Sequence, residues 1–349
     1  MKVRRVDPFS DPRWNKLVQA HPDGGVFHTT EWMDALRRTY GYEVLAYAIE
    51  ERNQLVSGIP FCKVKSFVTG SRLVSMPFSD HCQPLTQRGD DLDELLRAAQ
   101  AEAESDGLKY TEIRPLFSDE GRLQAMANLV KSNSVVVHKL DITPSEGDLL
   151  QTFHKDCIRR SIARSEREHL IYEEGRSDEL LSRFYKLLVL TRRRHQIPPQ
   201  PLAWFRNLIE CLGEKLKICV LSKDEAPIAS IITLSFKNVI TDKYSCADAR
   251  FNSLGGTVFL LWQLIRQARS QGFTELDLGR SDYATPGLIT FKDRWGAAGI
   301  PVDYYRYPRS AATNDPSDSR LVMAGKRFIT NVPDSMFIAL GRLLYRHVA

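Results

Sequence analysis

The sequence predicts an α/β (α+β) protein in which one unit, a mixed and mostly antiparallel sheet flanked by helices, is present twice. Three observations lead to this prediction. The chain has 349 residues, which is long for one hydrophobic core and favours two. Its hydrophobic periodicity indicates both strands and helices. The order of these elements in the first half of the chain recurs in the second half, so we expect two domains.

The first half is expected to contain a helix over residues 31–39 and strands at 43–51, 55–64 and 72–77. A second helix follows in the segment DLDELLRAAQAEAESDG, which is acidic at its start and ends on Gly107 as a C-cap. This helix leads directly into a strand, LKYTEIR.

The second half repeats this order. Strands at 216–221, 228–236 and 239–246 precede the helix TVFLLWQLIRQARSQG, which ends on Gly272 and leads into the strand FTELDLG. The two helix, glycine and strand units look like copies, although two ordinary α/β stretches can also resemble each other by chance. Proline and glycine interrupt the pattern near residues 142–148, where we place the seam.

The expected domains are therefore residues 1–145 and 146–308, with residues 309–349 as a linker and a C-terminal amphipathic helix. That helix, over about residues 335–347, is apolar on one side and carries Arg342 and Arg346. Its apolar face could dock on the protein itself or lie on a membrane surface.

The segment PGLITFKDRWG places a lysine where packing favours an apolar residue. It predicts a short helix in which Leu288, Phe291 and Trp295 share one face with Lys292. Burying an ammonium group costs several kcal/mol unless it is paired. Lys292 therefore either extends its charge to water or directs it into a cavity that receives an anion, and spacing alone leaves both open.

Polar residues also follow two of the predicted strands. Asp277 lies in an apolar strand, and Arg280 and Ser281 follow at its carboxyl end, where sheets tend to present ligands. Asp277 could equally bond to neighbouring backbone. In the first half, PFSDHCQP places Asp80 and His81 after a strand, facing the cleft that two packed copies would form.

Phosphate contacts have two candidate locations. Gly255 and Gly256 precede a helix and could expose backbone amides to a phosphate or pyrophosphate. On the basic helix HKDCIRRSIARSEREHL, an outward stripe of Arg160, Arg164 and Arg167 suits phosphates, unless the acidic neighbours turn it into a salt-bridged, solvated face.

A second basic cluster, TRRRHQIPPQP, contains Arg194 in the last turn of a helix that begins at Ser177. Cations there also complement the helix dipole without any ligand. The net charge of +5 suits a polyanionic partner such as tRNA, a nucleotide-linked substrate or an anionic membrane.

Cysteines and hydropathy bear on the compartment. The six cysteines form no CxxC pair and no ligand-spaced cluster with the eight histidines, so we expect reduced thiols and no structural metal. The N-terminus has no apolar signal core, and no apolar run reaches the roughly 18 residues of a membrane span. We therefore expect a cytoplasmic protein.

Several segments together carry a family resemblance, which extends in order to about Pro308. They are FHTTEW, GSRLVSMPFSDHCQPL, CIRRSIARSERE, TRRRHQIPPQP, KYSCAD, LDLGRS and FKDRWG. In these segments the chain resembles the FemAB family of peptidyl and acyl transferases, most closely the branch found beside exosortase and PEP-CTERM exopolysaccharide systems. The resemblance implies two tandem GNAT-like domains, the first on the acceptor side and the second on the acyl-donor side.

The resemblance also implies an activity. An aminoacyl or acyl group would move from aminoacyl-tRNA or acyl-CoA, with no bound cofactor, to an amine of a cell-envelope or exopolysaccharide precursor. Lys292 would stabilise the oxyanion as the lysine of the FK motif, and Tyr244 would lie near the acyl donor. The segment ARFNSLGGT departs from the loop with which GNAT proteins bind CoA, which favours aminoacyl-tRNA. The alternative is a non-catalytic GNAT-like scaffold in envelope polysaccharide assembly.

The sequence departs from the family in two further places. Met33 and Asp34 stand where some members have a basic residue, and Arg114 precedes a proline where some have aspartate. The resulting assignment has one catalytic residue, Lys292, and two binding groups. Substrate binding is assigned to Tyr244, Asp277, Arg280, Ser281, Phe291, Trp295, Asp80, His81 and Arg194. Donor phosphate binding is assigned to Gly255, Gly256, Arg160 and Arg164.

Overall fold

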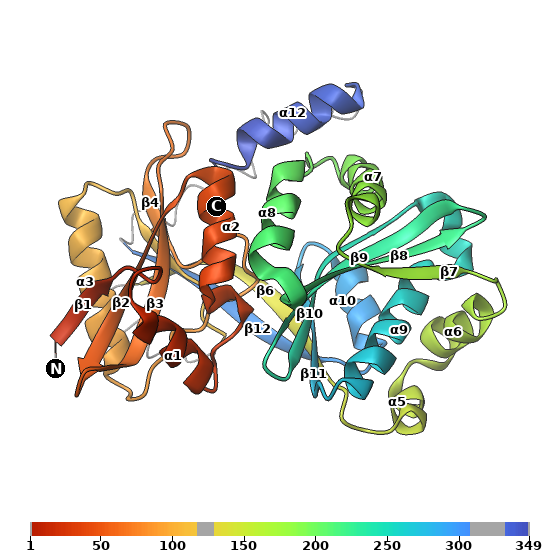
Figure 1. The fold of residues 1–349 in the computed structure, drawn as a ribbon, viewed down its shortest axis with the longest axis horizontal. Helices are drawn as coiled ribbons and strands as arrows, with labels where there is room; N and C mark the ends of the chain where they lie inside the picture. The colour runs from red at the N-terminus through yellow and green to blue at the C-terminus, as the bar shows by residue number, and fades with distance from the viewer. Residues whose placement is uncertain (1, 117–128, 308–331, 348–349) are drawn as a thin grey trace. The chain divides into compact units, whose positions relative to one another are not determined.

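The computed structural model describes residues 2–116, 129–307 and 332–347, which belong to two compact units (Figure 1). Unit 1 comprises Met1–Val135, Pro301–Asp318 and Leu343–Ala349. Unit 2 comprises Val136–Ile300 and Ser319–Arg342. Within the described ranges, no helix is both long enough and apolar enough to cross a membrane.

Unit 1 is built on a sheet with the strand order β1-β2-β3-β4-β5-β12. Its neighbouring strands are antiparallel except for β4 and β5, which are parallel. The elements are β1 (Lys2–Val6), α1 (Pro12–Ala20), η1 (Val26–His28), α2 (Thr30–Tyr40), β2 (Glu43–Glu51), β3 (Gln54–Val64), β4 (Arg72–Val74), α3 (Asp91–Ser105), β5 (Thr111–Ile113) and β12 (Ala298–Tyr307).

Helices cover both faces of this sheet, as the alternation of its side chains requires. Tyr47 and Ile59 face α3, where they pack with Leu95 in a hydrophobic cluster. Gly58 lies next to Ile59 and therefore faces the other way. A Cβ atom at Gly58 would lie 2.7 Å from the ring of Trp14 in α1, so only glycine lets α1 approach the strand this closely.

Unit 2 has the strand order β6-β11-β10-β9-β8-β7, again antiparallel from β7 to β10 and parallel between β10 and β11. The strand β6 belongs to this unit from Val136 onward. The strands and the helices between them are β6 (Val130–Asp141), α5 (Glu146–Thr152), η2 (Lys155–Arg159), α6 (Arg160–Ser165), β7 (Ile171–Gly175), α7 (Asp178–Arg194), α8 (Leu202–Leu212), η3 (Gly213–Lys215), β8 (Leu216–Lys223), β9 (Ala226–Phe236), β10 (Val239–Ala247), η4 (Ala249–Leu254), α9 (Gly256–Ser270), β11 (Glu275–Asp282), α10 (Pro286–Asp293) and α12 (Asp334–Leu344).

The duplication predicted from the sequence is confirmed by this topology. In each unit a strand is followed by two helices and three antiparallel strands, and then by a helix that leads into a parallel strand. Thus β1 to β5 with α1, α2 and α3 correspond to β7 to β11 with α7, α8 and α9. Figure 1 shows α7 and α8 on one side of the sheet of unit 2 and α9 and α10 on the other.

The end strands differ from the simple tandem order. The strand β12 follows unit 2 in the sequence, yet its residues 301–307 belong to unit 1, and the last three of them, from Tyr305 to Tyr307, pair with β5. The chain enters unit 2 after Val135, a few residues before the seam expected at 142–148. The acceptor and donor roles of the two domains stay predictions.

Two helices also differ in extent from the sequence pattern. The basic helix expected over residues 154–170 is a π-helical turn, η2, followed by α6, which ends at Ser165. The C-terminal helix α12 packs on unit 2 along one face, where Phe337 is fully buried and Arg193 lies over its ring at 4.5 Å. The expected linker falls mainly on residues 308–331, outside the described residues.

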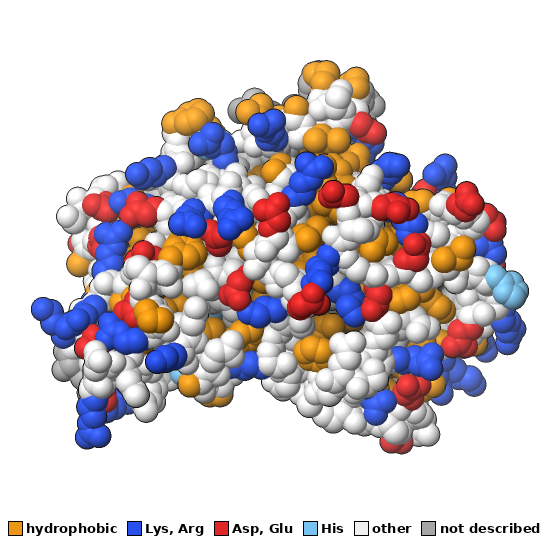
Figure 2. Space-filling model, viewed as in Figure 1, with side chains coloured by type: hydrophobic (Ala, Val, Ile, Leu, Met, Phe, Trp, Pro, Cys, Tyr) orange, Lys and Arg blue, Asp and Glu red, His pale blue; other side chains and the backbone are white. Residues whose placement is uncertain are grey.

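Charged side chains of both signs are interspersed on the face shown in Figure 2. Lys and Arg side chains there alternate with Asp and Glu, and this view shows no continuous basic surface.

Candidate active site in unit 2

The parallel strands β10 and β11 form a fork. Their paired residues run only from Val239–Thr241 to Glu275–Asp277, although both strands continue for several residues. Just beyond this point β10 carries a register shift against β9 between Asp242 and Tyr244, which bends it. An opening at the carboxyl end of parallel strands is where α/β sheets bind ligands, so the fork is the candidate active site.

Asp277 shapes the β11 side of the fork. Its residue is 3% exposed, and its Oδ1 accepts a hydrogen bond from Gly279 N at 2.7 Å. Gly279 has φ +67°, a left-handed conformation that glycine adopts without a steric penalty. The backbone bond is one of the two roles that the sequence allowed for Asp277. This hydrogen bond turns the backbone so that the carbonyl groups of Gly279 and Arg280 can accept hydrogen bonds from α10.

Lys292 reaches this turn from α10. The residue is 6% exposed, and its Nζ donates to Gly279 O at 2.8 Å and to Arg280 O at 3.1 Å. A lysine that extended its charge to water would leave the ammonium exposed, so the structure excludes that alternative. Two of the three N–H donors thus fix the ammonium on β11, just past the point where the strands separate.

His138 and Asp293 lie beside this lysine, and sequence reasoning missed both. The side chain of His138 on β6 is fully buried, and its Nε2 lies 3.2 Å from Asp293 Oδ1. Because a carboxylate only accepts, Nε2 carries the proton. Burial, reinforced by the charge of Lys292, lowers the pKa of His138. The available signal was a histidine inside the apolar run VVVHKLD.

Ser281 and Arg280 lie on opposite sides of β11. Ser281 is 1% exposed, and its Oγ has no hydrogen-bond partner among the described residues. Arg280 is exposed. A buried hydroxyl without a partner calls for an explanation, and a ligand that enters the fork is one.

Phe291 and Trp295 have a packing role in the structure. Trp295 is 1% exposed, and its ring centroid lies 4.9 Å from that of Phe153 in the core of unit 2. Phe291 is partly buried against the same core. They therefore anchor the helix that carries Lys292.

Tyr244 lies on β10, the other strand of the fork. It is 8% exposed, and its hydroxyl accepts a hydrogen bond from Trp204 Nε1 at 2.8 Å. The ring of Phe205 packs edge-on against it at 5.1 Å. Two aromatic residues of α8 thus fix the position of the hydroxyl.

The phosphate site predicted from the sequence falls on the first turn of α9. Gly255, with φ +71°, precedes the helix, and a cavity of about 90 Å³ adjoins Gly255 and Gly256. A Cβ atom at Gly255 would lie 3.4 Å from Ser161 O, so α6 covers part of this helix end. Arg164 Nη1 donates to Ser253 O at 3.0 Å beside it. Backbone N–H groups of a first helical turn attract anions, and the cavity has room for a small one.

The remaining predicted arginines are exposed. Arg160 forms an ion pair with Asp156 at 3.0 Å, as expected for a solvated helix face. Arg194 lies at the end of α7 and is exposed. Its neighbour Arg193 instead holds the C-terminal helix, through a bond to Asp334 Oδ1 at 2.5 Å.

Asp80 and His81 belong to unit 1 and follow β4. Asp80 is 7% exposed, and its backbone oxygen accepts a hydrogen bond from Tyr304 Oη at 2.8 Å. His81 packs edge-on against Phe27 at 6.0 Å. Asp80 is thus buried and His81 is half-buried in this unit.

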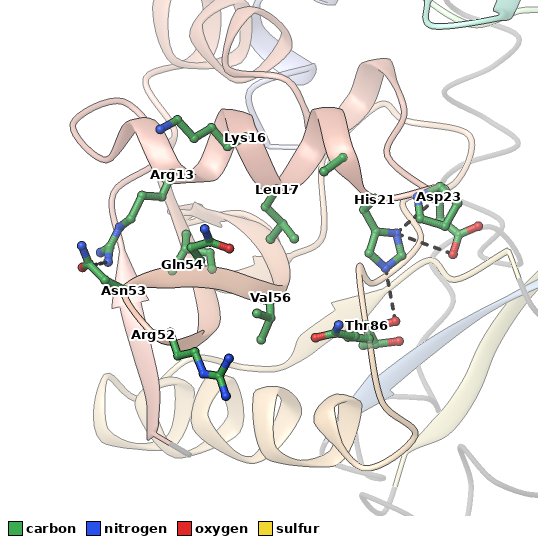
Figure 3. Close-up of a pocket in the computed structure, with 14 residues that line it drawn as sticks. Arg13, Lys16, Leu17, His21, Asp23, Arg52, Asn53, Gln54, Val56 and Thr86 are labelled. Atoms are coloured by element: carbon green, nitrogen blue, oxygen red, sulfur yellow. Dashed lines mark hydrogen bonds and ion pairs between the residues drawn. The ribbon is translucent and has the colours of Figure 1, made fainter.

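A cavity of about 830 Å³ in unit 1 lies between α1 and the start of β3 (Figure 3). Leu17 and Val56 form apolar parts of its lining. His21 is fixed there, because its Nε2 lies 3.2 Å from Thr86 O and its Nδ1 accepts from Asp23 N. No predicted site residue lines this cavity. Within the described residues, no group of three or more His, Cys, Asp or Glu could hold a metal ion.

One family model matches a part of the chain that lies within unit 2. A family model described as an acetyltransferase (GNAT) domain matches residues 153–293, which contain the fork, Lys292 and the start of α9. No curated protein matches the chain in sequence.

Several solved structures have a similar fold. FemX is 13% identical over 87% of this chain and 97% of its own, with a TM-score of 0.70. The C-terminal domain (DUF2156) of a putative lysylphosphatidylglycerol synthetase from Agrobacterium fabrum is 15% identical over 91% and 95%, with a TM-score of 0.56. A tandem GNAT protein from the clavulanic acid biosynthesis pathway is 10% identical over 90% and 100%, also with a TM-score of 0.56. At these identities the likeness shows the fold, which is tandem and GNAT-like.

Proposed function

We propose that this protein is an acyltransferase that moves an acyl or aminoacyl group from an activated donor to an amine acceptor. The observation that carries the proposal is the buried ammonium of Lys292, which two backbone carbonyls of β11 hold at the open fork. The match of residues 153–293 to an acetyltransferase domain supports the same reaction class.

The chemistry follows from the charge that develops during acyl transfer. The acceptor nitrogen attacks the carbonyl carbon of a thioester or ester, and the carbonyl oxygen becomes an oxyanion. A C–N bond then forms as the C–S or C–O bond breaks, and the departing thiolate or alkoxide takes up the proton that the amine loses. An ammonium fixed before the reaction stabilises the oxyanion without reorganisation, which contributes roughly 10² to 10³ in rate.

Lys292 would supply that positive charge, and the neighbouring His138 would not add a second one. Because burial and the lysine itself lower the pKa of His138, this imidazole stays neutral beside the ammonium. Ser281, whose buried hydroxyl has no partner among the described residues, would contact the acyl group or the amine. Tyr244 would face the donor from the other strand of the fork.

We propose acyl-CoA as the donor. The acetyltransferase domain match favours it, and the amides at Gly255 and Gly256 would bind a phosphate group of the donor with help from Arg164. The departure of the ARFNSLGGT loop from the usual CoA-binding pattern favours aminoacyl-tRNA instead. In that case Arg160 and its neighbours on α6 would contact phosphates.

The acceptor would be an amine-bearing precursor of the cell envelope or of an exopolysaccharide, as the resemblance to the exosortase and PEP-CTERM branch implies. The protein would act in the cytoplasm. A peripheral contact of α12 with a membrane is compatible with its docked state, because Met336 remains 55% exposed while Phe337 is buried.

The test is to incubate the purified protein separately with labelled acyl-CoA and with mixed charged tRNA, each with an extract of envelope precursors. We expect label from acyl-CoA to appear on an amine product. If label is transferred only from charged tRNA, the donor is aminoacyl-tRNA instead of acyl-CoA, and the proposed acyl transfer to an amine still holds. If neither donor is discharged, the proposal is wrong and a non-catalytic scaffold takes its place.

A further inference from the structure

The loop between β3 and β4 in unit 1 presents two exposed apolar side chains next to each other. Phe67 is 92% exposed and Val68 is 63% exposed. Single exposed apolar residues are common on protein surfaces, but an adjacent pair at a loop tip that protrudes from the fold is a typical interaction site. Figure 2 shows hydrophobic side chains projecting over this loop, with Lys and Arg side chains beside them.

The tip is held in one conformation by its own hydrogen bonds. Ser66 Oγ accepts from Val68 N at 3.2 Å and from Thr69 N at 3.0 Å, and Ser66 O accepts from Gly70 N at 3.0 Å. These bonds form a compact turn around Phe67. An ordered tip loses little conformational entropy when it binds, so its apolar area is available for affinity.

The C-terminal residues of the chain brace the same loop. Arg72 Nη2 and Thr69 Oγ1 donate to His347 O at 2.7 and 2.9 Å, and His347 Nδ1 lies 3.1 Å from Ser66 Oγ. The imidazole of His347 also packs edge-on against Phe67, at 4.8 Å between ring centroids. The base of the loop is therefore held by His347, while the side chains at its tip stay exposed to solvent.

Cations flank the tip. Lys65, Lys109 and Arg346 are exposed, and Lys109 Nζ lies 3.4 Å from Thr69 O at the base of the loop. The carboxylate of Asp106 on this side of the unit is paired with Lys63. An apolar tip with exposed cations at its base complements an anionic lipid surface, where the apolar groups enter the interface and the cations reach phosphates.

We propose that the β3–β4 loop docks the protein on anionic lipid bilayers, with Phe67 and Val68 inserted at the headgroup boundary. This proposal goes beyond acyl transfer and does not depend on it. The inserting element is the loop of unit 1, which is distinct from the apolar face of α12.

The test is co-sedimentation of the full chain with vesicles of phosphatidylcholine and phosphatidylglycerol in equal parts, and with vesicles of phosphatidylcholine alone. The wild type should bind the anionic vesicles, and added salt should weaken the binding. The double variant Phe67→Ser with Val68→Ser should lower the partition coefficient by roughly tenfold or more, because the side chains that lose contact are largely apolar. The variant Lys65→Gln should lower it about fivefold on anionic vesicles only.

The matched control is Ile171→Ser, which removes an apolar side chain that is 51% exposed on β7 in unit 2. It should bind like the wild type. The proposal is overturned if the wild type stays in the supernatant, or if the double variant sediments as well as the wild type. Light scattering that shows a wild-type dimer and a monomeric double variant would also overturn it, because the tip would then bind a second copy of the chain.

Discussion

The two units contain the same pair of parallel strands, yet one pair is closed and the other is open. In unit 1 the parallel pairing of β4 with β5 ends where Ser75 N donates to Glu112 O at 2.8 Å, and a later segment then lies beside the end of β5, because Cys82 forms an antiparallel bridge with Arg114 in which Cys82 N donates to Arg114 O at 2.7 Å. In unit 2 the pairing of β10 with β11 stops at Thr241, and the strands separate. The same topology thus has a further segment beside the end of β5 in unit 1, whereas in unit 2 the pairing of β10 with β11 ends at Thr241 and Asp277.

The buried charged residues of the two units also differ in their partners. In unit 1 Glu112 is 2% exposed and accepts hydrogen bonds from Arg114 at 2.8 Å and from Arg306 at 2.7 Å. Burial works to raise the pKa of Glu112, but the charges of the two arginines outweigh it and lower the pKa. In unit 2 the ammonium of Lys292 donates to two backbone carbonyls, Gly279 O at 2.8 Å and Arg280 O at 3.1 Å.

The largest effect is expected when the closed pair of unit 1 is broken. Glu112→Gln leaves two arginines beside a neutral side chain in a buried site, so the free energy of unfolding should fall by about 3–5 kcal/mol. Urea denaturation followed by circular dichroism measures it. The control Glu43→Gln removes an exposed partner of Arg5 and should cost under about 1 kcal/mol. Equal losses in the two variants would show that the unit 1 charges are not a structural closure.

A pH effect of similar size should come from His28 in unit 1. Burial is the main cause that lowers the pKa of His28 to about 4, and it outweighs the hydrogen bonds of the ring with Gln83 O and Gly25 N, which work to raise the pKa. Between about pH 6.5 and pH 4 the unfolded chain takes up a proton that the folded chain refuses. Stability should therefore be complete above this window and fall within it by something on the order of 3 kcal/mol.

The difference between the wild type and His28→Gln isolates this effect from the carboxylates that also titrate at low pH. The variant should have a flatter stability profile over the window. His138→Gln in unit 2 should flatten the profile less, because an ion pair with Asp293 partly compensates the protonated imidazole. Parallel profiles for the wild type and His28→Gln would contradict the assignment.

A substitution in the turn of β11 at the fork should have a smaller effect on stability and should also lower activity. Gly279→Ala places a side chain at φ +67° and should cost about 1–2 kcal/mol, and it should also shift the carbonyl that holds Lys292. Gly272→Ala is the matched control, since it has φ +85° and open space around the added Cβ. Both variants should lose similar stability, but only Gly279→Ala should lose turnover. Equal turnover of the two variants would show that the conformation of the turn at Gly279 does not affect the reaction.

Much of the fold was predictable because its signals are local. Helix caps such as Gly107, hydrophobic periodicity and the repeat of elements along the chain specify the strands, helices and duplication without knowledge of tertiary contacts. The placement of β12 in unit 1 was not predictable, because the order of a sheet differs from the order of the sequence. The same holds for the open and closed forks, which depend on where pairing stops.

The site was predictable only in part. Lys292 could be singled out because its position on an apolar helix face is a local conflict, and such conflicts tend to mark functional sites. His138 and Asp293 were missed because they come from segments far apart in the sequence. The packing roles of Phe291 and Trp295 were also hidden, since spacing shows which residues share a face but not what that face contacts.

The most direct test of the open fork is Lys292→Met, measured for turnover at saturating donor and for stability in parallel. We predict that turnover falls by roughly 10² to 10³ through loss of a fixed cation, while stability falls by only about 1–3 kcal/mol because two carbonyls lose their donor. The control Lys217→Met, which removes an ion pair with Glu174 on β7, should keep full turnover. Arginine at position 292 should restore little, since its planar group cannot replace a compact ammonium. Full turnover in Lys292→Met would contradict the account and leave this lysine with a structural role alone.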